Sequence, residues 1–245
     1  MFLLGVTPIL TFALGTWQIQ RLKWKVNLID DLQEKLQRPP IELPDFVNLD
    51  VLQEFTFRKV HVKGRWDHAH TVLLTPRVHD GTKGVHVITP FVRSDGSTIL
   101  VDRGFVSDDF AKPEYWQKTF EDQEEVEIIG MLRTSQARNY FTPDNHPEKG
   151  EWYWVDVNSL AEYAGGEAAG VQPVFIEAIF EGHPGEVHVN KQRGVPVGRP
   201  PTVEVRNSHA AYVATWYSLS ALTAFMFIHL LRKRARAPSR RMPRK

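Results

Sequence analysis

Cysteine is absent from this chain of 245 residues, and methionine occurs only four times. A chain without thiols forms no disulfide, no thiolate zinc site and no active site with a cysteine nucleophile. Four methionines also leave few soft ligands for copper, so the composition argues against a copper carrier.

The sequence also lacks the common catalytic signatures. It contains no G-x-S-x-G, H-E-x-x-H, P-loop or G-x-G-x-x-G segment, which are patterns of hydrolases, zinc proteases and nucleotide-binding proteins. His68 and His70 share one face of a possible strand, and His79 and His86 follow. A metal site there is conceivable, but scattered surface histidines are the simpler interpretation. We therefore expect a protein that is not an enzyme.

Charge is distributed unevenly along the chain. Eight of the 30 Lys and Arg residues lie in the tail 232–245, which has no acidic residue, so 22 basic and 29 acidic residues precede it. A basic tail alone is compatible with binding of nucleic acid or anionic lipid. Directly after an apolar run, it is more typical of a positive-inside membrane anchor. The acidic group Glu121, Asp122, Glu124 and Glu125 is most simply a solvated face.

Two apolar runs predict two transmembrane helices. Residues 210–231 contain His229 as the one side chain that could be charged near neutral pH, and about 20 apolar residues suffice to cross a bilayer. Residues 1–20 form the other run. A signal peptide is the alternative there, but no basic n-region or clear cleavage site is visible. Because residues 1–16 alone are slightly short for a span, either the helix extends to about Ile19 or sequence upstream has been lost; we favour a true membrane span.

Helical periodicity continues after the first run. The spacing of Leu22, Val26 and Leu36 predicts an amphipathic helix over 21–38, ended by Pro39-Pro40.

On that helix, Trp17, Arg21 and Trp24 lie on one side. This face is either an interfacial anchor, in which the arginine stacks on tryptophan, or a docking face for a partner.

The segment 39–206 predicts a mainly antiparallel β domain, a small barrel or sandwich with short helices. Its short runs of β-branched and aromatic residues are separated by turn signals such as Asp80-Gly81 and Ser94–Ser97. The expected strands lie around 60–62, 71–75, 85–92, 98–106, 125–132, 152–157 and 174–179. We further expect a helix over 159–163, capped by Ser159 and Glu162, and a proline-rich loop over 182–202.

Two spans would place both termini on one side of the membrane and the β domain on the other. The tail assigns the termini to the positive-inside face, which is the cytoplasm in a bacterium and the matrix in a mitochondrion.

His209 stands at the start of the second span. On a helix beginning there, Tyr212, Trp216, Ser220 and Thr223 fall within about 60° of it. A neutral imidazole beside aromatic rings is a reasonable axial haem ligand. The alternative is an interfacial histidine that is hydrogen-bonded to headgroups or to a loop.

His229 cannot complete such a site from the same helix, since it lies about 30 Å further along and is rotated by about 200°.

A succession of segments carries a resemblance to a known family. Residues 15–25 (GTWQIQRLKWK) and 207–216 (NSHAAYVATW) resemble segments of the surfeit locus protein 1 family of cytochrome c oxidase assembly factors. Further matches, in chain order, are Gly64-Arg65-Trp66, Pro76-Arg77, Gly84, Pro90-Phe91, Leu100–Val106 with Asp102-Arg103-Gly104, Gly130–Arg133 and Trp152–Asp156. Within these matches we expect structural roles for Gly64, Arg103 and Gly104, with Asp102-Arg103-Gly104 forming an ion pair and a turn.

The resemblance implies a chaperone of complex IV biogenesis that supports insertion of haem a into the catalytic subunit one. It implies haem a as the cofactor, with His209 as its axial ligand and no other metal; the helical wheel adds Tyr212 and Trp216 as neighbouring cofactor-binding residues. Expected partners are catalytic subunit one, other assembly factors and membrane lipid, but no nucleic acid. The expected location is the mitochondrial inner membrane, with the β domain in the intermembrane space; a bacterial plasma membrane is the alternative. A scaffold that binds oxidase intermediates without haem is the alternative function.

Overall fold

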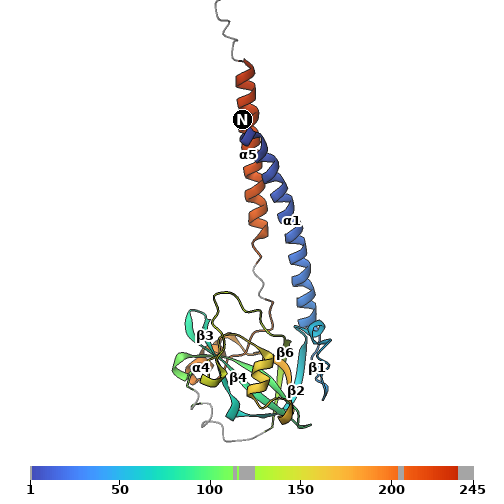
Figure 1. The fold of residues 1–245 in the computed structure, drawn as a ribbon, viewed down its shortest axis with the longest axis vertical. Helices are drawn as coiled ribbons and strands as arrows, with labels where there is room; N and C mark the ends of the chain where they lie inside the picture. The colour runs from blue at the N-terminus through green and yellow to red at the C-terminus, as the bar shows by residue number, and fades with distance from the viewer. Residues whose placement is uncertain (1, 113–114, 116–124, 204–206, 237–245) are drawn as a thin grey trace, which may run out of the picture. The chain divides into compact units, whose positions relative to one another are not determined.

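The computed structural model describes residues 2–112, 115, 125–203 and 207–236. The chain divides into two compact units. We call residues 1–31 with 203–245 the helical unit, and residues 32–202 the β unit (Figure 1). The acidic residues Glu121, Asp122 and Glu124 and the tail beyond Arg236 lie outside the described residues.

Two long helices make up the helical unit. Helix α1 spans Phe2–Gln37, its last turns belonging to the β unit, and α5 spans His209–Arg236. Among the described residues, α5 is the one helix that is long and apolar enough to cross a membrane. The first membrane span therefore stays a prediction. The amphipathic helix expected over 21–38 is continuous with the apolar run, since no break interrupts α1.

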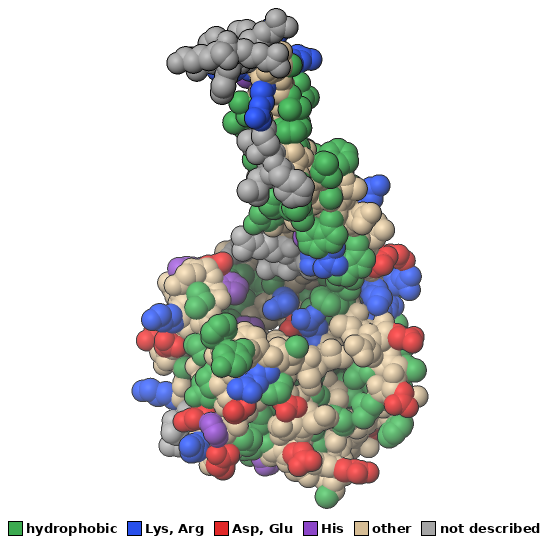
Figure 2. Space-filling model, turned by 45° about the horizontal axis from the view of Figure 1, so that its top comes forward, with side chains coloured by type: hydrophobic (Ala, Val, Ile, Leu, Met, Phe, Trp, Pro, Cys, Tyr) green, Lys and Arg blue, Asp and Glu red, His purple; other side chains and the backbone are tan. Residues whose placement is uncertain are grey.

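Small residues on α1 allow the two helices to approach closely. A Cβ atom on Gly15 would lie 2.9 Å from the ring of Tyr217, and one on Gly5 would lie 3.1 Å from the ring of Phe227. Close contact through small residues is typical of paired membrane helices. Large apolar side chains elsewhere on both helices remain exposed, and Figure 2 shows them along the helices, whereas the β unit carries mixed charges.

The β unit is a barrel-like sheet, as predicted. Its strands follow the order β1-β2-β6-β7-β5-β4-β3, and an additional β2–β4 pairing closes five of them into a ring. Most pairings are antiparallel, but β5 pairs with β7 in parallel. The strands are β1 (Ile41–Glu42), β2 (Lys59–Trp66), β3 (Val72–His79), β4 (Thr82–Arg93), β5 (Thr98–Ser107), β6 (Val126–Arg133) and β7 (Val171–Ala178).

Both hairpin turns expected from the sequence are present. Asp80-Gly81 joins β3 to β4 with positive φ at both residues, which a type I′ turn requires. Residues 94–97 join β4 to β5, and Asp95 accepts from the backbone and the hydroxyl of Ser97.

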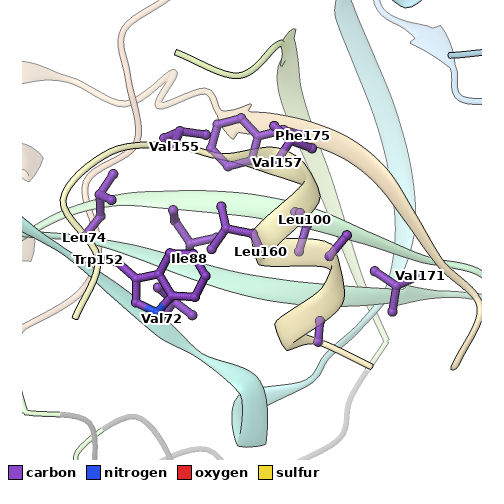
Figure 3. Packing of buried hydrophobic residues seen from close by; sticks show 12 residues of the cluster. Val72, Leu74, Ile88, Leu100, Trp152, Val155, Val157, Leu160, Val171 and Phe175 are labelled. Carbon is purple, nitrogen blue, oxygen red and sulfur yellow. The ribbon is translucent and has the colours of Figure 1, made fainter. Parts of the chain in front are cut away.

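Apolar side chains are buried on both faces of the sheet. The barrel interior contains Phe91, Val101 and Ile176, among others. On the outer face, Trp152 and Leu160 pack over Phe175 and Ile88 (Figure 3). The short helices are α3 (Val157–Tyr163), α4 (Pro184–Arg193), and the 3-10 turns η1 (Leu52–Phe55), η2 (His68–His70), η3 (Asp108–Phe110), η4 (Pro147–Lys149) and η5 (Glu167–Ala169).

The strand expected at 152–157 is absent, and the prediction was wrong. Trp152 forms only an isolated bridge with Leu74. The side chain of Asn145 then satisfies the backbone in place of a strand partner: its Oδ1 accepts from the amide of Tyr153, and its Nδ2 donates to the carbonyl of Trp154. Local side-chain bonds of this kind compete with sheet pairing.

The helix boundaries also required correction. Helix α3 begins at Val157 rather than Ser159, because Asp156 is its N-cap and accepts from the amide of Ser159. The expected loop over 182–202 contains α4, which has Pro184 in its first turn and ends at Gly194 in the left-handed region. Proline at the start and glycine at the end are helix signals, and they were misinterpreted as loop signals.

Candidate functional site

His209 is paired with a side chain from α1. Its Nδ1 lies 2.7 Å from the side-chain carbonyl oxygen Oε1 of Gln18. His209 is the first residue of α5, and its backbone amide donates to Oδ1 of Asn207 at 3.3 Å. The histidine and the glutamine are 191 residues apart in sequence, so only the packing of α1 against α5 brings them together.

The protonation of the imidazole follows from its partner. A carbonyl oxygen only accepts hydrogen bonds, so Nδ1 of His209 carries the proton when the ring is neutral. The other nitrogen, Nε2, then carries the lone pair. Among the described residues, Nε2 has no hydrogen-bond partner. A half-buried imidazole in this state is competent to ligate a metal.

Two members of the predicted polar stripe, His209 and Ser220, contact α1. Ser220 is 8% exposed, and its hydroxyl donates to the carbonyl oxygen of Pro8 at 2.8 Å. Trp216 and Thr223 are half-buried, and the Thr223 hydroxyl donates to the carbonyl of Leu219 within its own helix. The stripe therefore joins the two helices at two of its five positions.

Tyr212 differs from the rest of the stripe. It is 52% exposed, so it lies at the margin of the helix contact rather than within it. The role of Tyr212 and Trp216 beside a ligand stays a prediction.

His229 lies far along α5 from His209. Its ring stacks on Phe225 at a centroid distance of 6.4 Å, and it is exposed. The structure brings it to no other member of the stripe.

The three residues expected to contact a partner lie on the surface of α1. Trp17 and Trp24 are each 50% exposed. The guanidinium carbon of Arg21 lies 4.6 Å from the centroid of the Trp24 ring, which is a cation–π distance. The stacking expected for an interfacial anchor is thus present, and the exposed rings equally leave a face on which a partner could dock.

A second polar cluster, on the outer face of the β unit, was not anticipated as a group. Nδ1 of His86 on β4 lies 2.7 Å from Oδ2 of Asp102 on β5. Glu177 on β7 is the strand partner of Asp102. Its Oε2 lies 3.4 Å from Nε of Arg133 and 3.4 Å from Nε of Arg199.

Burial and charge shift the pKa values within this cluster. Burial disfavours the charged imidazolium, but the Asp102 carboxylate and its hydrogen bond outweigh that effect and raise the pKa of His86. Burial also raises the pKa of Glu177, although Arg133 and Arg199 oppose the shift. These shifts fit a structural network buried beside the core, because each charge has a neighbouring countercharge.

Gly64 and Gly104 lie where the backbone of a neighbouring segment approaches closely. A Cβ atom on Gly64 would overlap the carbonyl oxygen of Val92, and one on Gly104, where φ is 117°, would overlap that of Val197.

The guanidinium of Arg103 lies 4.5 Å from the centroid of the Trp66 ring, and burial lowers the pKa of Arg103 to about 10. The turn expected at 102–104 is instead a bulge within β5, since Gly104 pairs with Val87 while Asp102 pairs with Ile88.

The histidines considered as metal ligands are dispersed. His68 and His70 lie in η2 rather than on a strand, which corrects the expectation. His70 binds Asp67, whereas His86 binds Asp102 and His79 stacks on Phe105. Within the part of the chain that the structure describes, no group of three or more His, Asp or Glu residues could hold a metal ion.

Gln18 was the residue of the site that sequence reasoning missed. Its position within the G-T-W-Q segment was visible, but wheel geometry compares residues only within one helix.

Comparison with known proteins identifies the family. The SURF1 family matches residues 6–221. Surfeit locus protein 1 of Homo sapiens is 36% identical over 242 residues, covering 92% of this chain and 75% of that protein. The Mus musculus protein of the same name is 35% identical over 235 residues, covering 90% and 72%. A SURF1-like protein of Monosiga brevicollis is 37% identical over 247 residues, covering 96% and 89%. With a family match over most of its length and relatives above one-third identity along nearly all of it, the chain belongs to the SURF1 family.

Proposed function

We propose that this protein is a membrane-anchored assembly factor for cytochrome c oxidase that holds haem a as cargo at His209. The observation that carries the proposal is the 2.7 Å contact between His209 Nδ1 and Gln18 Oε1, because it leaves Nε2 of a half-buried ring free to act as a ligand. The resemblance of the whole chain to cytochrome c oxidase assembly factors supports haem a as the cargo.

The donor set suits a carrier rather than an enzyme. When bound, the haem iron would be held by Nε2 of His209, and Tyr212 and Trp216, which follow on the same face of α5, would supply aromatic surface for the macrocycle. His229, about 30 Å further along the helix, offers no second ligand.

We further propose that the chain lies in the mitochondrial inner membrane with two spans, in α1 and α5, and with the β unit in the intermembrane space. The apolar first half of α1, its small-residue contact with α5 and the basic end of α5 support this arrangement. Its partners would be catalytic subunit one of the oxidase and further assembly factors.

A haem titration of the detergent-purified chain tests the ligand assignment. We expect the Soret band of added haem a to shift from that of free haem when the wild-type protein binds it, and this shift to be lost in His209→Ala. His229→Ala is the matched control, because it removes a histidine from the same helix, and it should bind as the wild type does. Equal binding by wild type and His209→Ala would overturn the assignment.

A scaffold without haem is the second candidate function, and one observation favours it. Trp17, Arg21 and Trp24 present an exposed aromatic and cationic face that haem ligation at His209 does not use. Under this alternative the Soret band of the added haem would stay that of free haem in detergent at every haem concentration. Trp17→Ala with Trp24→Ala would then abolish co-purification with oxidase intermediates.

A further inference from the structure

We propose that Gln18 is a positioning residue for His209: its side-chain carbonyl fixes the Nδ1–H tautomer and so reserves Nε2 for the ligand. The inference rests on the proposed function in so far as that ligand is haem. The tautomer itself is a property of the chain alone.

The chemistry of the pair gives the reason. In a neutral imidazole one nitrogen donates and the other accepts, and the partner of the first decides which is which. Gln18 Oε1 lies 2.7 Å from Nδ1 and can only accept. An acceptor behind a ligating imidazole also raises the basicity of the other nitrogen, and loss of such a partner typically weakens metal binding by about 10- to 100-fold.

The pair is held by helix packing rather than by a loop. About two turns along α5 from His209, the Tyr217 hydroxyl lies 3.2 Å from the Thr16 hydroxyl. The Tyr217 ring fills the space that a side chain on Gly15 would occupy. Further along, the hydroxyl of Ser220 donates to the carbonyl of Pro8 at 2.8 Å. Because these contacts fix α1 against α5, Gln18 meets His209 before any ligand arrives.

A neutral amide is the suitable acceptor at this place. A carboxylate would bring a charge to the contact between α1 and α5, where the neighbouring contacts are made by hydroxyl groups, a backbone carbonyl and an aromatic ring, and charges between paired membrane helices are costly. Glutamine supplies the same carbonyl oxygen without that cost. Gln18, the last residue of the G-T-W-Q segment, thereby has a role that helical periodicity alone did not suggest.

The first experiment measures the tautomer without haem. The full chain, labelled with ¹⁵N-histidine in detergent micelles, should show His209 protonated at Nδ1, its signals being identified by their loss in His209→Ala. Gln18→Leu should shift the ring toward the Nε2–H form. Gln20→Leu is the matched control, since it changes an exposed glutamine on the same helix, and it should leave the signals unchanged. A His209 tautomer that is the same in wild type and Gln18→Leu overturns the proposal.

The second experiment uses haem as the probe. If His209 binds haem, Gln18→Leu should lower the affinity about 10- to 100-fold and raise the midpoint potential, because a less basic imidazole stabilises ferric iron less. Gln18→Glu keeps an acceptor and should restore affinity with a potential at or below that of the wild type. Equal affinity and potential in Gln18→Leu and Gln20→Leu would contradict the proposal.

The experiments distinguish failure of haem binding at His209 from failure of the positioning role of Gln18. Absence of haem binding in the wild type overturns the proposed function alone, because the tautomer measurement still reports on Gln18. Far-UV circular dichroism of each variant, compared with that of the wild type, shows that α1 and α5 are intact.

Discussion

The carboxylate of Asp102 on β5 and the imidazole of His86 on β4 form a buried pair, with 2.7 Å between Oδ2 and Nδ1. The other carboxylate oxygen of Asp102 accepts from the backbone amide of Gly104 at 2.9 Å. One side chain therefore joins two neighbouring strands and also holds the bulge that follows it in β5.

Asp102→Asn should destabilise the protein by roughly 3 kcal/mol, because removing one partner of a buried pair leaves the other uncompensated. The pKa of His86 is raised above its ordinary value in the folded state. The contribution of the pair is therefore fully present below that ordinary value and is lost as the pH rises through the raised pKa. Thermal unfolding at pH 5.5 and pH 9 should show the larger loss at pH 5.5. Asp67→Asn, beside the exposed His70, is the matched control and should have little effect at either pH.

Glu177→Gln should become more stable relative to the wild type as the pH rises from 4 to 8. Burial raises the pKa of Glu177 in the folded state, so the wild type loses stability as that carboxyl ionises, whereas glutamine does not ionise. The free energy of unfolding of both proteins, measured across this range, checks the sign.

Glu127→Gln should show the opposite pH dependence of stability to Glu177→Gln. Hydrogen bonds from Lys63 and His61 lower the pKa of Glu127, so the variant should lose stability relative to the wild type over the same pH range. If the stability of the two variants relative to the wild type changed in the same direction with pH, one of the two pKa directions would be contradicted.

Gly15→Leu should separate α1 from α5. A Cβ atom at this position already lies 2.9 Å from the Tyr217 ring, and the rest of a leucine side chain has no space. Because the chain has no cysteine, a Pro8→Cys and Ser220→Cys pair, placed where the two helices already share a hydrogen bond, can report the contact by oxidative cross-linking while Tyr217 stays in place. We expect a severalfold lower cross-linking yield with Gly15→Leu and an unchanged yield with Ala13→Leu, which lies on the exposed side of α1.

Gly104→Ala should be among the most damaging single substitutions in the β unit. The residue has φ of 117°, and the added Cβ would overlap the backbone carbonyl of Val197. Backbone strain of this kind costs about 1–3 kcal/mol, and the overlap adds to it. Gly185→Ala, within α4 and with open space around it, should be neutral or stabilising by about 1 kcal/mol. Comparison of the two thermal unfolding midpoints tests the expectation.

Local signals predicted much of the β unit. Alternation of Val60 and Val62 with polar neighbours and the turns Asp80-Gly81 and Ser94–Ser97 located strands and hairpins, because both depend on short-range sterics. Local signals failed at Trp152, which has strand composition but packs against the outer core while Asn145 takes over the following backbone bonds. These side-chain bonds of Asn145 to the backbone leave no periodic pattern in the sequence, so hydrophobic alternation could not predict them.

The sequence by itself determined the apolar helix over 210–231, a mainly antiparallel β domain that is a barrel or a sandwich, and the family to which the chain belongs. Composition, periodicity and short motifs are sufficient for these features, because each is a property of residues close together in the chain. Only the tertiary structure decided that the sheet closes into a barrel, that Gln18 is the partner of His209, that Asp102 pairs with His86, and that Ser220 of the polar stripe bonds to α1. Each of these joins elements far apart in the chain, and their distances are set by packing, which no single helix or strand encodes.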